Sequence, residues 1–180
     1  MNKIVIIING TGGSGKDTIV NILKDYYIIK NVSSIDPIRE MASMVGYDIA
    51  DKSPKSRKFL SDLKRIVTEY NNYPNRYMVN HYLDFYDDDM LQILFFHIRE
   101  PENIAWVKEA IISKHREEYT SEPLKVYTML IKAPWNNNTY GNHSDDDVEK
   151  YNYDFIYMND KPLDELRVDF MKFFDNLNII

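Results

Sequence analysis

The sequence of 180 residues contains no cysteine. This absence excludes a disulfide framework, a thiolate zinc site and a cysteine nucleophile, and it suits an intracellular protein. Long apolar runs are also missing. No segment approaches the roughly 20 apolar residues of a membrane span, and the run from Ile4 to Ile8 is too short for the core of a signal peptide. We therefore expect a cytoplasmic protein with no membrane segment.

Positive charge is scarce as well. The chain has 22 Lys and Arg against 28 Asp and Glu, a formal net charge of −6, which repels nucleic acid backbones unless basic residues gather in one patch. We therefore expect no nucleic-acid polymer as a partner. The hydrophobic fraction of 44% supplies the apolar surface for a core, and the length suits a single domain over residues 1–180. The oligomeric state stays open, including a homodimer.

Strand-like and helix-like segments alternate along the chain. Runs typical of strands occur at residues 3–9, 28–33, 90–98, 125–131 and 154–158. The first, a continuous β-branched run, is typical of a central strand buried on both faces. Helical spacing or a helix-starting proline predicts helices that begin near residues 15, 36, 54, 74, 101 and 162. This alternation implies right-handed crossovers. We therefore expect an α/β fold in three layers, with a parallel sheet of about five strands and helices on both faces.

Two consecutive helices, predicted over residues 54–70 and 74–86, have no strand between them. The first is expected to bury a stripe formed by Phe59, Leu63, Ile66 and Val67. We expect residues of about 37–88 to form a helical lobe that stands off the sheet. The polar stretch at about 133–147 is predicted to be a loop.

Four of the six glycines lie in one short segment, residues 10–16, which fits the pattern G-x-x-x-x-G-K. This segment directly follows a predicted buried strand and directly precedes a predicted helix. Backbone N–H groups of such a loop point inward at the positive end of a helix dipole, and the lysine reaches the β- and γ-phosphates. We therefore predict a P-loop NTPase fold that binds ATP through Thr11, Gly12, Gly13, Ser14, Gly15, Lys16, Asp17 and Thr18.

The residue after Lys16 is Asp17, at the position where switch GTPases and ATPase motors place a hydroxyl on magnesium. Thr18 follows, as in the G-K-x-T loops common among nucleoside monophosphate kinases, which hold the ion largely through water. We expect Mg2+ near Asp17, bound directly or through water. The elements N-K-x-D and D-x-x-G are both absent from the sequence, which argues against a nucleotide-dependent switch.

With S-G-K-D-T in the loop, the sequence resembles the P-loop kinases of the deoxynucleoside monophosphate kinase type known from bacteriophages and bacteria. Further segments that resemble elements of this family are scattered over the chain. They are D-P-I-R-E at residues 36–40, S-R-K-F-L at 56–60, H-I-R-E-P at 97–101 and Y-D-F-I-Y-M-N-D at 153–160.

The resemblance implies an ATP- and Mg2+-dependent kinase of a small acceptor, a (deoxy)nucleoside monophosphate first. It implies catalytic roles for Lys16 and Arg99, and a place facing the acceptor for Asp36, Arg39 and Arg57. The helical lobe would bind the acceptor, and the polar loop would act as a lid. A kinase of another small phosphorylated metabolite is an alternative.

Each of these polar residues also has an alternative interpretation. Arg39 and Arg99 follow strands that should end at the P-loop edge, where open α/β sheets bind ligands, but each could be a surface charge. Asp36 could cap a helix. Glu100 could orient Arg99, hold Mg2+ through water, or be a solvated carboxylate.

The basic residues of the 54–70 helix also have two interpretations. They form either a solvated face or a site for an acceptor phosphate, with Arg57 favoured by the resemblance; the set is Lys55, Arg57, Lys58 and Arg65.

Three features depart from the family pattern. Gly12 and Gly13 replace the basic pair usual inside the loop, and His97 replaces an aspartate. The stretch from Pro134 to Ser144 has no Arg or Lys, and Lys132 is the nearest cation. These departures motivate a further alternative, an ATP-binding protein with a degenerate kinase site.

Overall fold

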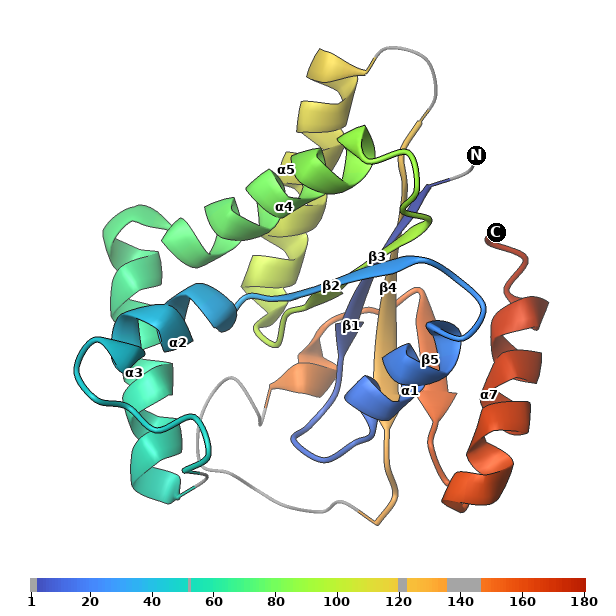
Figure 1. The fold of residues 1–180 in the computed structure, drawn as a ribbon, viewed down its shortest axis with the longest axis horizontal. Coiled ribbons are helices and arrows are strands. Elements are labelled where there is room, and N and C mark those ends of the chain that lie inside the picture. The colour runs from blue at the N-terminus through green and yellow to red at the C-terminus, as the bar shows by residue number, and fades with distance from the viewer. Residues whose placement is uncertain (1–2, 52, 120–122, 136–146) are drawn as a thin grey trace.

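The computed structural model describes residues 3–51, 53–119, 123–135 and 147–180 (Figure 1). Its centre is a five-stranded sheet in the order β2-β3-β1-β4-β5, in which every neighbouring pair is parallel. The strands are β1 (Ile4–Asn9), β2 (Ile29–Ser33), β3 (Ile93–His97), β4 (Lys125–Lys132) and β5 (Phe155–Met158). The predicted parallel sheet is confirmed.

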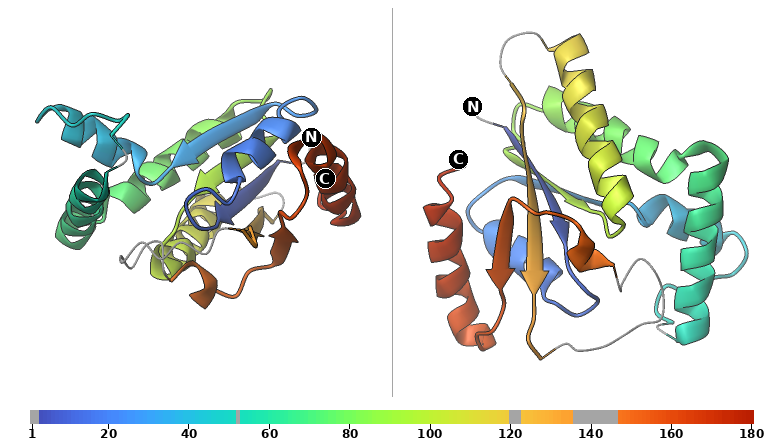
Figure 2. Two further views of the ribbon diagram at one scale, coloured as in Figure 1. Left: turned by 90° about the horizontal axis from the view of Figure 1, so that it is seen from below. Right: turned by 180° about the vertical axis from the view of Figure 1, so that it is seen from behind.

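Helices cover both faces of this sheet (Figures 1 and 2). The helices are α1 (Lys16–Leu23), α2 (Asp36–Ser43), α3 (Pro54–Asn71), α4 (Tyr73–Asp87), α5 (Pro101–Glu118) and α7 (Leu163–Asn176), with a short 3-10 helix, η1 (Val148–Lys150). Helices α1 and α7 pack on one face of the sheet and form one hydrophobic core with it. Helices α4 and α5 pack on the opposite face and form a second core. The molecule therefore has three layers.

Strand β1 explains why both faces need a cover. All six of its residues are buried. Successive side chains of a strand point to opposite faces, so Ile4, Ile6 and Ile8 enter the core under α1 and α7. Val5 and Ile7 enter the core under α4 and α5. A central strand that is buried on both faces needs apolar side chains toward each of them, and the continuous β-branched run of β1 supplies them.

Helices α2 and α3 stand off the sheet beside the carboxyl end of β2 (Figures 1 and 2). They share a small third core around Ile38, Ala42 and Leu60. Helix α4 lies elsewhere: Tyr82 and Phe85 are buried in the core on the sheet. Of residues 37–88, α2 and α3 are therefore the part that stands apart from the sheet.

The buried side of α3 differs from the predicted stripe. Phe59 is 40% exposed and Ile66 is 54% exposed, so the prediction was wrong for these two residues. The row that faces inward contains Leu60 and, one turn later, Lys64. Apolar spacing could not reveal a buried lysine, because its burial depends on a partner from another element.

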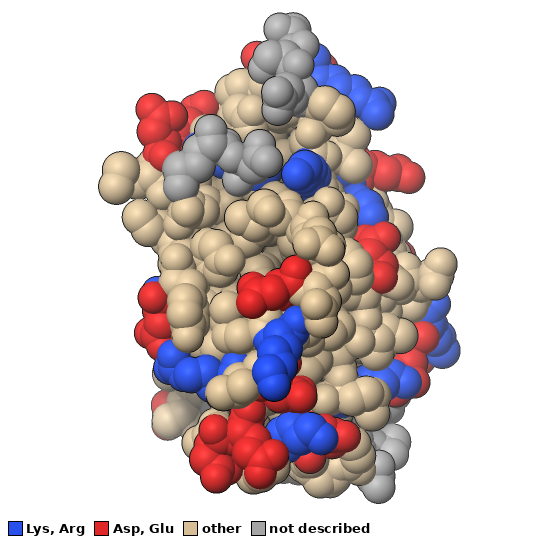
Figure 3. All heavy atoms as spheres, turned by 90° about the vertical axis from the view of Figure 1, so that its right-hand side faces the viewer, with Lys and Arg blue, Asp and Glu red and all other residues tan. Residues whose placement is uncertain are grey.

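Charges of both signs are mixed on the side of the molecule that carries α7 (Figure 3). Ion pairs are part of this pattern, such as Arg167 of α7 with Asp25, which follows α1. Among the helices that the structure describes, none has the length and apolarity needed to cross a membrane.

Candidate nucleotide-binding site

The glycine-rich loop connects β1 to α1 and is held by two asparagines. The side-chain Oδ1 of Asn9 accepts a hydrogen bond from the N–H of Gly10 at 2.7 Å. The Nδ2 of Asn159, just after β5, donates to the carbonyl of Ser14 at 2.9 Å. Neither contact was predicted; a fully buried polar residue at the end of a buried strand is the signal that could have indicated Asn9.

Gly10 leaves no room for a side chain. Its φ is +148°, and a Cβ atom there would lie 2.5 Å from the carbonyl oxygen of Ile131 and 2.6 Å from the Oγ of Ser14. We expect Gly10→Ala to lower the free energy of unfolding by about 3 kcal/mol, because backbone of β4 would have to move. Urea denaturation measures this change.

Gly46 provides the matched control for that substitution. Its φ is +80°, but a Cβ atom there would meet nothing within 4 Å. Gly46→Ala should therefore cost only the backbone strain, about 1 kcal/mol. Equal losses in the two variants would show that the close approach to β4 is unimportant.

The side chain of Lys16 lies over the loop. Its Nζ donates to the carbonyls of Gly10 at 2.5 Å and Thr11 at 2.9 Å, and to the Oγ of Ser14 at 3.4 Å. The positive charge therefore lies at the loop, at the N-terminus of α1, where an anion is also favoured by the helix dipole. Phosphate oxygens could replace these carbonyl acceptors.

A cavity of about 790 Å3 extends from this loop toward the lobe formed by α2 and α3. It brings together most of the predicted site residues, namely Gly12, Gly13, Lys16, Asp17, Asp36, Arg39, Arg57 and Arg99. The other predicted loop residues, Thr11, Ser14, Gly15 and Thr18, belong to the same loop and helix start but do not line the cavity.

On the lobe side, Asp36 and Arg39 face each other. The Asp36 Oδ1 lies 3.4 Å from the Arg39 Nη1, and its Oδ2 accepts from the N–H of Ser33 at 2.8 Å. Ile35 occupies the cap position of α2, so the alternative of Asp36 as the cap is wrong. The Arg39 Nε is buried and has no hydrogen-bond partner among the described residues. A ligand oxygen could satisfy it.

Three of the four basic residues predicted on α3 separate into two groups. Lys58 and Arg65 are exposed and pair with Asp62 and Glu69, four residues further along the helix, which confirms a solvated face for these two. Arg57 instead lines the cavity.

The predicted loop over residues 133–147 lies largely outside the described residues. At its start, Trp135 lines the cavity. Lys132, the cation nearest to the loop in sequence, pairs with Glu149 at 2.7 Å.

His97 lies at the end of β3, where the resembled family has a carboxylate. Its Nε2 lies 2.8 Å from the Oδ1 of Asn31, and because that oxygen only accepts, Nε2 carries the proton. Burial lowers the pKa of His97 to about 4, assisted by the positive charges of Lys16 and Arg99 and opposed by Asp17. The imidazole is therefore neutral near pH 7 and adds no positive charge to the cavity.

The depressed pKa of His97 predicts a pH-dependent stability. Between the ordinary value of 6.5 and about 4, the unfolded chain binds a proton that the folded chain does not, so stability should fall as the pH is lowered through this window. The contribution is at most about 3 kcal/mol. Urea denaturation of the nucleotide-free protein in EDTA should show that the free energy of unfolding depends less on pH in His97→Gln than in wild type. Parallel curves of stability against pH would contradict the lowered pKa of His97.

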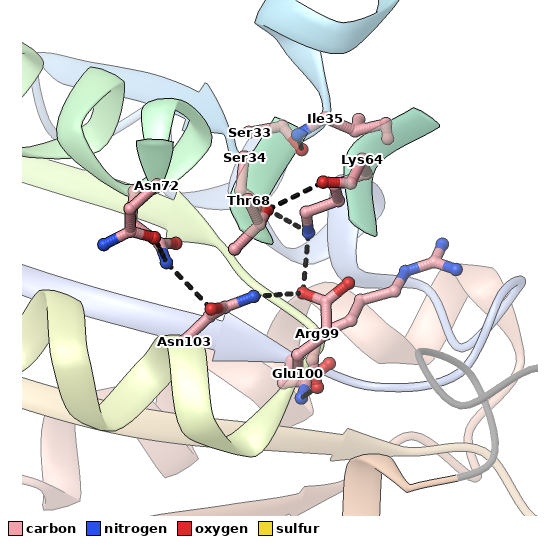
Figure 4. A network of polar contacts seen from close by, with 11 residues as sticks. Ser33, Ser34, Ile35, Lys64, Thr68, Asn72, Arg99, Glu100 and Asn103 are labelled. Carbon is pink, nitrogen blue, oxygen red and sulfur yellow. Dashed lines mark hydrogen bonds and ion pairs between the residues drawn. The ribbon is translucent and has the colours of Figure 1, made fainter. Parts of the chain in front are cut away.

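Glu100 is not a solvated carboxylate. It is 8% exposed, and its Oε2 lies 2.6 Å from the Nζ of Lys64. In Figure 4 the guanidinium of Arg99 points away from this carboxylate. Of the three roles considered for Glu100 from sequence, the solvated carboxylate is wrong, and the other two stay predictions. Its observed partner is Lys64 of α3, a cavity-lining residue that the sequence did not reveal.

Among the described residues, acidic and histidine side chains do not form a ready metal cage. Across residues 3–51, 53–119, 123–135 and 147–180, no group of three or more metal-ligating side chains is placed to hold an ion. Asp17 is exposed and lines the cavity next to Lys16. A single carboxylate of this kind suits Mg2+ that is bound mainly by phosphates and water.

The sheet order, the loop between β1 and α1 and the helices on both faces define a P-loop NTPase fold. Solved structures with this fold include dephospho-CoA kinase from Campylobacter jejuni, with a TM-score of 0.54, 13% identity and 96% of each chain covered. An unliganded sugar kinase from Janibacter sp. HTCC2649 has a TM-score of 0.50 at 11% identity, over 96% of this chain and 95% of that one.

A third structure is TT1252 from Thermus thermophilus, with a TM-score of 0.50 and 14% identity over 99% of this chain and 100% of that one. No established family model matches the sequence, and no curated protein matches it. At these identities the likeness establishes the fold, and function has to be argued from the site.

Proposed function

We propose that this protein is an ATP-dependent phosphotransferase that acts on a small acceptor, with a (deoxy)nucleoside monophosphate as the first candidate. The observation that carries this proposal is the shape of the cavity: one continuous space of about 790 Å3 joins the P-loop to the cationic side of the lobe. This volume is in the upper part of the range of ligand pockets, about 300–1,000 Å3. Two of the structural neighbours are also named as kinases.

The donor side of the cavity suits a triphosphate. The N–H groups of the loop and the ammonium of Lys16 would bind the β- and γ-phosphates. Arg99 follows β3, which pairs with β1, so it lines the same cavity beyond the loop. Its guanidinium would offset the charge on the equatorial oxygens of the phosphoryl group during in-line transfer.

The acceptor side suits an anionic molecule. Arg39 has a buried Nε that lacks a partner among the described residues, and Arg57 lines the same end of the cavity. A guanidinium recognises phosphate through several donors in a planar arrangement. Asp36 holds Arg39 in place and offers a carboxylate to a sugar or base. We therefore assign Asp36, Arg39 and Arg57 to the acceptor.

Asp17 is the residue that would hold Mg2+, directly or through water. The bound ion would supply positive charge to the β- and γ-phosphate oxygens. His97 does not contribute in this way, because a neutral imidazole is a poor ligand for a hard cation that prefers oxygen.

The proposal is tested with the purified protein, ATP, Mg2+ and a panel of nucleoside monophosphates, nucleosides and small phosphorylated metabolites. We expect ADP formation that depends on one acceptor class, and stabilisation against heat by the same acceptor. Tight ATP binding without acceptor-dependent ADP would instead favour a binding protein with a degenerate site. That alternative is motivated by His97 in place of a carboxylate.

A further inference from the structure

A buried ion pair joins the lobe to the edge of the sheet (Figure 4). The Nζ of Lys64, in the middle of α3, donates to the Oε2 of Glu100 at 2.6 Å and to the Oγ of Ser34 at 2.9 Å. Lys64 is 6% exposed and Glu100 is 8% exposed. Ser34 follows β2 and Glu100 follows β3, so one ammonium from the lobe binds the carboxyl ends of two neighbouring strands.

The carboxylate of Glu100 is also connected to the turn between α3 and α4. The Nδ2 of Asn103 donates to its Oε2 at 3.3 Å, and the Nδ2 of Asn75 donates to the Oδ1 of Asn103 at 2.8 Å. Asn75 in turn donates to the Oδ1 of Asn72, which has a left-handed φ of 57° between the two helices. Glu100 is thus connected directly to α3 and, through Asn103 and Asn75, to the turn that follows α3.

Arg99 lies between these contacts and the P-loop. Its carbonyl oxygen accepts from the Nδ2 of Asn9 at 2.8 Å, and the Oδ1 of the same asparagine binds the N–H of Gly10. The backbone that carries Arg99 is therefore fixed to the start of the P-loop on one side and, through Glu100, to α3 on the other. Its guanidinium is directed away from Glu100 (Figure 4) and lines the cavity.

Stability alone does not account for this ion pair. Removing two charges from water is costly, and an apolar pair of similar volume often stabilises a fold as well or better. An ion pair with further hydrogen bonds does fix relative position, because its distances and directions are restricted. Here the position that it fixes is that of α3 relative to the segment next to Arg99.

We propose that Lys64 is a positioning residue: through its buried ion pair with Glu100, it holds the lobe against the sheet edge and holds Arg99 where its guanidinium faces the P-loop. This inference rests on the proposed function. Lys64 also lines the cavity, so direct binding of the acceptor is the competing role. Its ammonium already binds Glu100 and Ser34, and an acceptor phosphate would have to displace these partners.

The decisive variant is the double substitution Lys64→Met with Glu100→Gln. Each single substitution leaves one buried charge unpaired and should destabilise the fold, whereas the double substitution removes both charges. We expect the Tm of the double variant to return to that of wild type. Its kcat should stay about 100-fold below wild type, because a misplacement of about 1 Å costs this much. Its KM for ATP should change by less than about threefold. Lys64→Arg should retain more activity than Lys64→Met.

Lys58→Met is the matched control. Lys58 is on the same helix and also forms an ion pair, with Asp62 at 2.8 Å, but its side chain is 77% exposed; kcat should be unchanged. A wild-type kcat in the stable double variant would overturn the positioning role. A raised KM for the acceptor at unchanged kcat would also overturn it and would assign Lys64 to acceptor binding.

Hydrogen exchange separates failure of this inference from failure of the proposed function. Adding ATP and Mg2+ to wild type should protect amides in residues 54–71 and 97–103 as well as in the P-loop, and in the double variant only those in the P-loop. Protection confined to the P-loop in wild type would overturn the positioning role. Protection of all three segments in wild type, without phosphoryl transfer to any acceptor, would overturn the proposed function but not the positioning role.

Discussion

Lys16→Ala is expected to lower the rate of phosphoryl transfer by about 10³-fold or more. The ammonium lies on the loop that should hold the β- and γ-phosphates, where it donates to the carbonyls of Gly10 and Thr11 and to the Oγ of Ser14. These contacts lie within the loop, so we expect the fold to stay intact. Steady-state kinetics and thermal unfolding of the same preparation measure the two effects.

Lys125→Ala provides the control for a lost lysine. Lys125 is exposed at the start of β4, whereas the P-loop follows the carboxyl end of the parallel strand β1, so both activity and Tm should be unchanged. Unchanged turnover in Lys16→Ala would show that the nucleotide is held elsewhere. A large fall in Tm would show that Lys16 supports the fold, and the loss of activity would then say nothing about phosphate.

Much of the fold could be predicted because its signals are local. The run of β-branched residues in β1 is long enough to show burial on both faces, and prolines mark the first turn of four helices, α2, α3, α4 and α5. The strand order has no such signal. Strand β3 lies between β1 and β2, and nothing in the similar apolar runs of these strands distinguishes neighbours from non-neighbours.

The sequence indicates the site most clearly where one segment carries it. The P-loop is contiguous, so spacing and flanking elements indicate it together. Lys64 and Glu100 are 36 residues apart, and each resembles an ordinary surface charge until the fold brings them together. The same reason explains the mistaken stripe on α3: apolar spacing favoured Phe59 and Ile66, whereas the ion pair turns Lys64 inward.

Arg99→Ala is expected to lower kcat by about 10²- to 10³-fold, with a much smaller effect on the KM for ATP. The guanidinium lines the cavity beyond the loop, so it should act on charge that develops during transfer rather than on the bound triphosphate. Arg99→Lys should recover only part of the rate, because an ammonium lacks the planar set of donors. Arg116→Ala, at the exposed end of α5, should behave as wild type.

The distribution of the Arg99→Ala effect between kcat and KM distinguishes two accounts of the cavity. Loss of an interaction made only in the transition state lowers kcat and kcat/KM equally, whereas loss of uniform binding raises KM alone. A pure rise in the KM for ATP would place Arg99 with Lys16 as a ground-state phosphate ligand. It would also remove the reason for fixing the Arg99 segment through Lys64 and Glu100, since a ground-state ligand on a flexible side chain tolerates a shifted backbone better than a transition-state contact does.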